Sequence, residues 1–247
     1  MSTTVPRDVI VVGGGVAGLS AAVFTARHGL DTLVIDSGES ILRRNAHLEN
    51  FPGFPSGLNA RRLLDLLAEQ VENAGAHRHE AAVQRVKQSE GEDGFAVETD
   101  AGERYLSQYV IAATKNTTEY LVDLDGVGII DRGKTFVDTD ERGRTGVDGL
   151  YAAGRLAEKP HQAVVCAGHG AEVAVTVLED DERPFYHDWV APDGYFTARG
   201  RDLPPGCEEI DEDERRRREA RSLETMRERF AEPHPDDQVT HPSLRDD

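Results

Sequence analysis

The stretch DVIVVGGGVAG, residues 8–18, decides the fold of this chain. Its first five residues form a nearly continuous apolar run, which is typical of a parallel strand buried on both faces. The glycine pattern G-x-G-x-x-G follows, and the small apolar residues 19–28 predict a helix. A second strand is expected at residues 32–35, closed by Asp36. This order of strand, glycine loop, helix, strand and acid indicates a Rossmann-like domain that binds an adenine dinucleotide.

Each glycine of the loop has a physical task in such a domain. Gly13 allows a tight turn, Gly15 lets a pyrophosphate approach the backbone, and Gly18 allows the helix to pack closely on the strand. The phosphates then meet the unpaired N–H groups at the start of the helix. Asp36 stands where a carboxylate accepts hydrogen bonds from an adenosine ribose. A purely structural glycine turn is the alternative, and the motif by itself does not separate FAD from NAD.

The next part of the chain reads as an α/β domain with a small antiparallel meander. Apolar residues at helical spacing predict an amphipathic helix that stops at Gly75. A turn at residues 100–102 indicates an antiparallel pair of strands around it. The predicted elements are a helix at 61–74, antiparallel strands at 95–99 and 103–106, a buried strand at 109–113, a short strand at 149–154 and a helix at 161–178.

Several further segments, in the same order, resemble the thioredoxin reductase family of flavoproteins. They are LENFPGFP at 48–55, TGVDGLYAAG at 145–154, and QAV at 162–164 followed by AGHG at 167–170. In that family the first segment borders the isoalloxazine ring and the second leads to the ribityl chain. The start of the last helix faces the pyrimidine edge of the flavin. The resemblance implies FAD as the cofactor and, because the family's FAD domains form dimers, a homodimer.

The residues expected to bind FAD lie in these motifs and beside them. Arg44 and Asn45 precede the segment at 48–55 and offer polar groups to phosphates or a substrate, with an exposed loop as the alternative. Val83 resembles a position whose backbone reads adenine, and it is equally an ordinary strand residue. His47 and His161 are possible proton donors near the ring, although a lone histidine is more often polar surface. The full expected set is Gly13, Gly15, Val16, Ala17, Gly18, Asp36, Ser37, Arg44, Asn45, Asn50, Val83, Ala113, Thr114, Gly154, Arg155, His161, Gln162 and Ala163.

Three departures from the family matter as much as the match. The family inserts an NADPH-binding domain after the strand at 109–114, but only about thirty residues separate Thr114 from Thr145, too few for such a domain. The family's redox Cys-x-x-Cys lies in that domain, and no such pair occurs here. The family motif ends Ala-Gly-Asp, and Arg155 replaces the aspartate. Arginine cannot accept a hydrogen bond, so Arg155 either reaches the pyrophosphate or flavin N1/O2 edge, or turns to solvent and leaves FAD less tightly held.

The composition of the chain argues against nucleic acid and membrane as binding partners. The 247 residues include 46 acidic and 28 basic side chains, a formal net charge of −18, and only four lysines. This charge disfavours a nucleic-acid binder, no apolar run is long enough for a membrane span, and residues 1–6 show no leader pattern. Acidic, lysine-poor chains are typical of salt-loving archaea, with an acidic mesophilic protein as the alternative. The expected location is the cytoplasm.

A change of composition near Glu179 predicts a second part of the chain. Residues 1–182 are expected to form the FAD-binding domain, with its two halves joined directly near 115–135. Residues 183–247 are expected to form a mostly irregular or helical C-terminal extension with a charged helix at about 210–231, in which acids precede arginines by four residues. A narrow apolar stripe predicts that one edge of this helix packs on the body; a partner-binding helix is the alternative.

The sequence therefore predicts an FAD-binding oxidoreductase that is not a thioredoxin reductase on its own. A redox protein partner or a small reductant would supply its electrons. The alternative is a non-catalytic flavin-binding or regulatory subunit. Cys166 is expected to be a packed thiol and Cys207 an unpaired one. No catalytic residue can be assigned from the sequence. No metal site is expected either, because His187 and Asp188 with His77 and His79 make no zinc signature.

Overall fold

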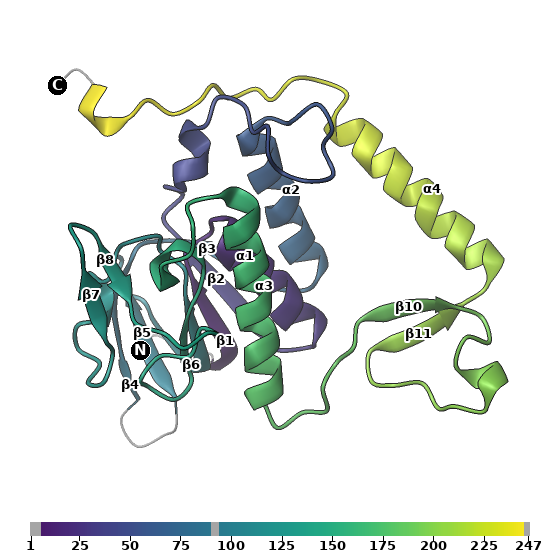
Figure 1. Cartoon of the computed structure of the whole chain (residues 1–247), viewed down its shortest axis with the longest axis horizontal. Helices are drawn as coiled ribbons and strands as arrows, with labels where there is room; N and C mark the ends of the chain where they lie inside the picture. The colour runs from purple at the N-terminus through teal and green to yellow at the C-terminus, as the bar shows by residue number, and fades with distance from the viewer. Residues whose placement is uncertain (1–5, 90–93, 245–247) are drawn as a thin grey trace. The chain divides into compact units, whose positions relative to one another are not determined.

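The computed structural model describes residues 6–89 and 94–244. Contacts between residues divide the chain into two compact units. Unit 1 comprises residues 1–181 and 238–247, and unit 2 comprises residues 182–237. Figure 1 follows the chain through both units. Residues 1–5, on which the expected lack of a leader rests, lie outside the described residues.

Unit 1 holds a seven-stranded sheet, the helices beside it and a separate hairpin (Figure 1). The strands of the sheet are β1 (Pro6–Val12), β2 (Thr32–Asp36), β3 (His77–Glu80), β4 (Val83–Gln88), β5 (Phe95–Thr99), β6 (Arg104–Ala112) and β9 (Leu150–Ala152). The helices are α1 (Val16–Arg27), α2 (Ala60–Asn73) and α3 (Ala163–Asp180), with short 3-10 helices η1 (Ile41–Arg44), η2 (Glu119–Leu121), η3 (Gly154–Ala157) and η5 (Pro242–Leu244). The hairpin pairs β7 (Ile129–Asp131) with β8 (Thr135–Val137).

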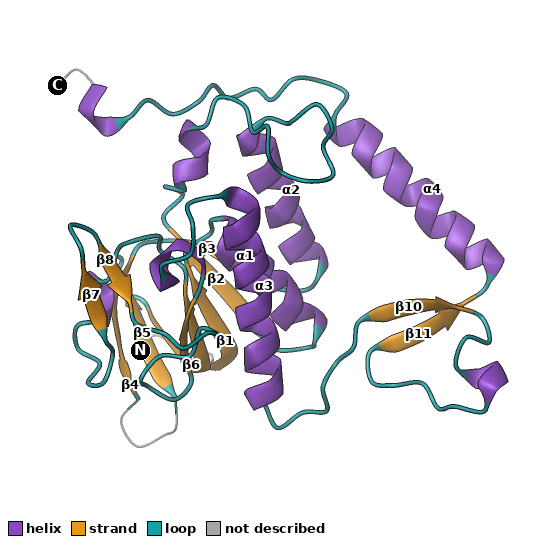
Figure 2. Cartoon of the chain, in the orientation of Figure 1, coloured by secondary structure: helices purple, strands orange, loops and turns teal. Residues whose placement is uncertain are grey.

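The sheet combines a parallel core with an antiparallel meander. Its strand order is β3-β2-β1-β6-β5-β4, and β9 also pairs with β6. Strands β3, β2, β1, β6 and β9 run parallel, while β4, β5 and β6 form the meander (Figure 2). This arrangement confirms the predicted Rossmann-like α/β class. The carboxyl ends of the parallel strands meet at one edge, which is where ligands bind in sheets of this kind.

Strand β6 is longer than the sequence indicates. The sequence predicts two strands, at 103–106 and 109–113, but one unbroken strand, Arg104–Ala112, takes in most of both ranges. One edge of β6 pairs with β1; the other pairs first with β5 and then with β9. The polar residues Ser107 and Gln108 interrupt the apolar run and so conceal this continuity. Ser107 is nevertheless buried, because β6 lies between other strands there.

Alternate residues of β1 pack into two cores on opposite faces of the sheet. Val9 and Val11 join the core that includes apolar residues of α1, α2 and α3. Ile10 and Val12 join the core that includes residues of the meander, η2 and β8. The strand is therefore buried on both faces, as its continuous apolar run predicts.

Helices α1 and α3 lie side by side (Figure 1) and approach closely through glycines. A Cβ atom added to Gly170 of α3 would overlap the backbone carbonyl of Ala17. A Cβ at Gly154 would lie 2.7 Å from the Ala17 Cβ, and Gly154 also has a φ of +65°. The AGHG and AAG segments thus have a packing role besides any contact with a cofactor.

Unit 2 is a small module built around a parallel strand pair. It contains β10 (Trp189–Pro192), η4 (Thr197–Arg199), β11 (Cys207–Ile210) and α4 (Glu212–Arg229). The Glu209 carboxylate accepts hydrogen bonds from the Thr197 hydroxyl, at 2.7 Å, and from backbone N–H groups at 194, 196 and 197. The Thr197 hydroxyl and these N–H groups lower the pKa of Glu209 to about 2. Glu209 thereby fixes the loop that follows β10.

The charged helix of unit 2 carries many ion pairs. Asp211 caps its start by accepting from the Glu214 N–H at 2.7 Å. Arg218 pairs with Glu208 and Glu214. No residue of α4 is buried, and the side chain of Leu223 in its apolar stripe is 52% exposed. Packing of this stripe stays a prediction.

None of the helices in the described part of the chain has the length and hydropathy of a membrane span. The same residues contain no group of three or more His, Cys, Asp or Glu side chains placed to hold a metal ion.

Candidate functional site

The glycine loop between β1 and α1 is held tightly by its surroundings. Gly13 has a φ of +108°, and a Cβ there would lie 2.8 Å from the carbonyl oxygen of Ala113. Its N–H donates to Ile35 O at 2.8 Å. A Cβ at Gly18 would overlap the carbonyl of Gly13. These contacts require glycine at both positions and place the loop against the residues that follow β6, including the predicted Ala113 and Thr114.

Gly15 differs from its neighbours, because space is open beside it. It is the N-cap of α1, it has no side chain to cap the helix, and a Cβ there would meet only Ser40 Oγ at 3.6 Å. The N–H groups at the start of α1, where Val16 and Ala17 lie, therefore have no competing side-chain acceptor from the cap residue. This is the arrangement that binds a pyrophosphate at a helix N-terminus.

Asp36 lies next to the loop at the end of β2. A Cβ on Gly14 would overlap the Asp36 carboxylate. The carbonyl of Asp36 accepts from the Ala81 N–H at 3.1 Å, so its backbone is fixed by the segment after β3. These two contacts place the Asp36 carboxylate at the edge of the glycine loop. A carboxylate is needed there to accept hydrogen bonds from the ribose hydroxyls.

A shallow hollow lies beyond Asp36 and contains the predicted Ser37. It is lined by Ser37, His79, Glu80, Ala81, Ala82, Asp100, Ala101 and Glu103. His79 Nε2 lies 2.5 Å from Glu103 Oε2, which ties β3 to the turn of the meander. Val83 does not line this hollow; its side chain packs against the core toward the meander. Its role in reading adenine stays a prediction.

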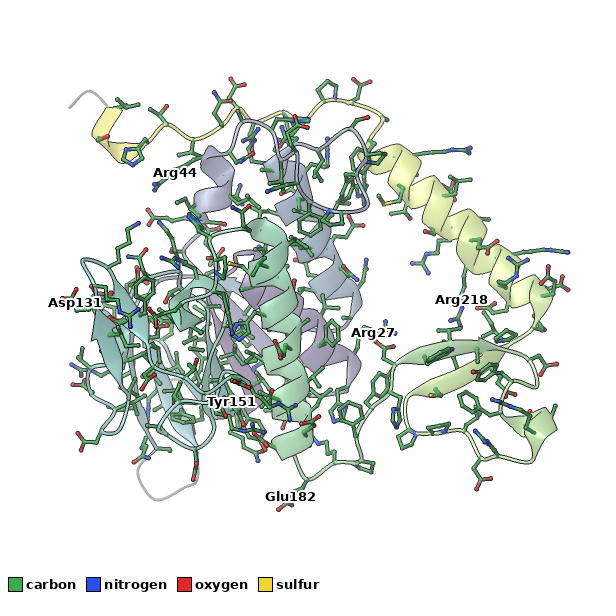
Figure 3. The ribbon with its side chains drawn as sticks, viewed as in Figure 1. Arg27, Arg44, Asp131, Tyr151, Glu182 and Arg218 are labelled. Carbon is green, nitrogen blue, oxygen red and sulfur yellow. The ribbon has the colours of Figure 1, made fainter. Side chains whose placement is uncertain are left out.

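Arg61, which the sequence places on an ordinary amphipathic helix, fixes η1. It is only 3% exposed, and its Nη1 donates to the carbonyls of Arg43, at 3.1 Å, and Asn45, at 2.8 Å. Arg44, labelled in Figure 3, stands between Arg43 and Asn45 in the sequence and is the last residue of η1. The Asn45 Oδ1 atom is buried and has no hydrogen-bond partner among the described residues. A buried acceptor without a partner fits a ligand that brings hydrogen-bond donors.

Two segments that carry the resemblance meet directly. The Asn50 side-chain amide donates to Gln162 Oε1 at 2.7 Å, which joins the segment at 48–55 to the residues before α3. A hollow is lined by Glu49, Asn50, Phe51, Pro52, Gly53, Phe54 and Pro55. Ala163 begins α3 directly after Gln162. His47 is exposed and pairs with Glu49 at 2.8 Å.

His169 was not among the expected site residues, yet it fixes the start of η3, just after β9. The residue is 4% exposed, and its Nδ1 accepts a hydrogen bond from the Gly154 N–H at 2.9 Å. The ring proton therefore lies on Nε2, which is buried without a partner among the described residues. Burial, with a smaller contribution from Lys159, lowers the pKa of His169 to about 4. A histidine inside an apolar helix gives no sequence signal of this contact.

Arg155 is anchored and does not turn to solvent. Its guanidinium lies over the Phe136 ring, 4.6 Å from the centroid, and its Nη1 donates to the Lys159 carbonyl at 3.1 Å. The residue is half-buried. The alternative of a freely exposed arginine is therefore wrong, because β8 supplies an aromatic face that holds the planar cation.

The two cysteines are free. Cys166 is 6% exposed, and burial raises the pKa of its thiol. Its Sγ donates to the Pro160 carbonyl at 3.4 Å. Cys166 is therefore a packed, protonated thiol, as the sequence predicts.

Comparison with known proteins agrees with this geometry. A family model described as an FAD binding domain matches residues 8–48. The thioredoxin reductase of Aquifex aeolicus (strain VF5) is 42% identical over 71 residues, which cover 28% of this chain and 22% of that protein. The thioredoxin reductase of Rickettsia typhi (strain ATCC VR-144 / Wilmington) is 30% identical over 119 residues, 47% of this chain and 38% of that protein. The matched stretches thus span less than two fifths of these relatives.

The fold comparison covers more of the chain. A solved structure of a thioredoxin reductase from Gloeobacter violaceus aligns with a TM-score of 0.61 at 18% identity. The alignment covers 74% of this chain and 99% of that chain. The glycine loop, the acid beside it and the free Asn45 acceptor fit FAD, and the FAD-binding family model covers the first two of these features and Asn45. The chain is therefore similar to thioredoxin reductases in sequence and in fold, and its residues 8–48 match an FAD binding domain.

Proposed function

We propose that this protein is an FAD-dependent oxidoreductase that has no NADPH-binding domain inserted in its FAD domain. A redox protein partner or a small reductant supplies its electrons. When bound, FAD supplies the capacity to accept and release one or two electrons. The residues of the chain bind and orient the cofactor through the glycine loop, Asp36 and the start of α1.

The connection from β6 to β9 is the observation that carries this proposal. Residues 113–149, all of them described, form a tight turn, η2 and the β7–β8 hairpin. A dinucleotide-binding half needs several parallel strands with their crossover helices. The hairpin is short, and its residue Phe136 contributes to unit 1 by packing under Arg155. The segment between the two halves of the FAD domain is therefore too small to bind NADPH, which supports an electron donor other than a domain inserted there.

The cysteines support a function that does not use the dithiol relay of a thioredoxin reductase. A dithiol relay needs a reactive thiolate close to a second cysteine. Cys166 is buried with a raised pKa, and no Cys-x-x-Cys occurs in the sequence. Electrons would therefore leave the flavin directly for an acceptor, with no thiol of this chain between them.

Anaerobic reduction of the FAD-loaded protein tests the proposal. Separate samples receive NADPH, NADH, a reduced ferredoxin or dithionite, and the visible flavin absorbance is followed after rapid mixing. We expect dithionite and the ferredoxin to bleach the flavin quickly and NADPH to do so slowly without saturation, as expected for collision with no binding site. Rapid, saturable reduction by NADPH would contradict the proposal.

The position of Arg155 favours one alternative, a non-catalytic flavin-binding subunit. Arg155 is held by Phe136 and the Lys159 carbonyl where the family has a hydrogen-bond acceptor. In the reduction experiment this alternative predicts that dithionite bleaches the flavin while every other donor fails. The homodimer implied by the resemblance stays a prediction, which light scattering of the purified protein would test.

A further inference from the structure

Unit 1 gathers five basic side chains from five separate segments at the carboxyl edge of its sheet. Arg44 comes from η1, and Lys115 follows β6. Lys134 lies in the turn of the β7–β8 hairpin, Arg155 is in η3, and His161 precedes α3. Together these residues are called the cation cluster. It contains two of the four lysines in a chain whose net charge is −18.

Hydrogen bonds and ring contacts hold the segments of the cation cluster together. Thr135 Oγ1, next to Lys134, donates to the Asn116 carbonyl, next to Lys115, at 2.7 Å. Phe136, in the same hairpin, lies under the Arg155 guanidinium. The hairpin therefore connects three members of the cluster through its own side chains.

Within the described ranges, the lysines and arginines of the cluster have no carboxylate partner. Among the described residues, no carboxylate lies within ion-pair distance of any lysine or arginine of the cluster. Acids do find basic partners close by, since Arg132 of the same hairpin pairs with Glu158 at 3.0 Å. Burial comes first in lowering the pKa of Lys115, followed by repulsion from Lys134, Arg44 and Arg155. The described part of the chain thus keeps these like charges together without a carboxylate counter-ion.

Lys115 also has an unusual backbone. Its φ is +67°, in the left-handed region that a residue with a side chain rarely adopts. Such conformations persist where the surrounding structure imposes them, and they cluster at ligand sites. The turn after β6 imposes it here, because the N–H groups of Asn116 and Thr117 both donate to the Thr114 carbonyl.

We propose that the cation cluster is a binding site, in the FAD-loaded protein, for a small molecule that carries a phosphate or diphosphate group. The proposal rests on the proposed function only in one respect, namely that this molecule is then the electron acceptor. The cluster lies close to the glycine loop, because Lys115 is two residues beyond Ala113, whose carbonyl faces Gly13.

The chemistry of the cluster fits a compact, multiply charged oxyanion. Arginine offers a planar fork of donors that matches phosphate oxygens, and lysine adds a point charge. A large acidic partner would meet repulsion from the remainder of a surface with this net charge. A small anion avoids that repulsion, because it contacts only the cluster. The carboxyl edge of the parallel strands is also the usual ligand side of the fold.

Calorimetry with inorganic pyrophosphate on the FAD-loaded protein at low ionic strength tests the proposal. The variants are Lys134→Gln, on an exposed turn, and Lys115→Gly, which suits the positive φ. Lys87→Gln is the matched control, because Lys87 pairs with Glu98 at 2.9 Å outside the cluster. We expect each cluster variant to weaken pyrophosphate binding by about tenfold or more, the usual effect of losing a charged hydrogen bond. The control should bind like the wild type.

A second arm separates this site from the diphosphate of FAD itself. The affinity of the cofactor-free protein for FAD is measured for the same variants. If the loaded protein binds no pyrophosphate while the cluster variants lose FAD affinity, the cations serve the cofactor and the proposal is overturned. Pyrophosphate binding that is equal in wild type and cluster variants also overturns it. If the site binds as expected but no donor reduces the flavin, the oxidoreductase proposal fails and the anion site stands.

Discussion

His169 gives a prediction of stability whose size follows from the structure. The buried neutral ring accepts the Gly154 N–H, and burial lowers its pKa from 6.5 to about 4. In the unfolded chain the ring is protonated below pH 6.5, whereas in the folded protein it stays neutral until about pH 4. The unfolded state therefore binds more protons across this window. Stability from His169 is complete above pH 6.5 and falls as the pH drops toward 4.

The expected loss is a substantial fraction of the stability of a typical domain, which is about 5–15 kcal/mol. Linkage between these two pKa values gives about 2 kcal/mol of lost stability at pH 5, and about 3 kcal/mol below pH 4. The perturbation is His169→Gln, whose side-chain oxygen can accept from the Gly154 N–H but does not titrate. The variant should be less stable at neutral pH and should lose less stability on acidification.

Urea unfolding at neutral pH and at pH 5, followed by circular dichroism, measures the effect. The quantity of interest is the change in unfolding free energy between the two pH values, compared between wild type and variant. We expect this change to be about 2 kcal/mol smaller in the variant. His77→Gln, at an exposed strand position, controls for the loss of any histidine. Equal pH dependence in wild type and His169→Gln would refute the assignment of a buried neutral ring.

Three other predictions concern packing, charge and salt. Gly170→Ala should destabilise the fold by about 1–3 kcal/mol, because its Cβ would overlap the Ala17 carbonyl. Gly168→Ala in the same helix, with nothing within 4 Å, should stabilise it by about 0.5–1 kcal/mol; thermal unfolding that ranks the two alike would contradict this packing. Burial, then repulsion from Lys115, Arg155 and Lys134, lowers the pKa of His161. A bound dianion favours the protonated ring, so calorimetry should show sulfate binding more tightly as the pH falls, and His161→Gln should abolish that trend. Molar KCl, which shortens the screening length to about 3 Å, should raise the melting temperature of this acidic chain; a lower melting temperature would argue against adaptation to salt.

The sequence predicted the parallel core well because its signals are local. A continuous apolar run, a glycine loop and a terminal acid each report on one strand or turn. The short strands β3, β7 and β8 have no such pattern. β7 and β8 hold three residues each, and β3 is the edge strand His77–Glu80 with polar side chains. Their existence depends on pairing partners that are distant in the chain.

In the candidate site, too, the residues with a local sequence signal were predicted and those that depend on distant partners were not. The glycine loop and Asp36 were predicted from spacing, and the structure brings them into contact. Arg61 was not predicted, because an arginine at the start of an amphipathic helix looks like a surface residue. His169 was not predicted, because a histidine inside an apolar helix gives no sequence signal of its contact. Their roles arise from the carbonyls of η1 and the N–H of Gly154, which only the folded chain brings within reach.

The affinity of the cofactor-free protein for FAD, compared between wild type and Gly15→Ala, tests the central claim most directly. Gly15 has room for a methyl group, with only Ser40 Oγ at 3.6 Å, so the variant should fold like the wild type. The methyl group would stand where a pyrophosphate must approach the backbone. We predict that the wild type binds FAD and that Gly15→Ala binds it at least about tenfold more weakly with an unchanged circular dichroism spectrum. Equal affinity in the two proteins, or a wild type that binds no FAD, would contradict the account.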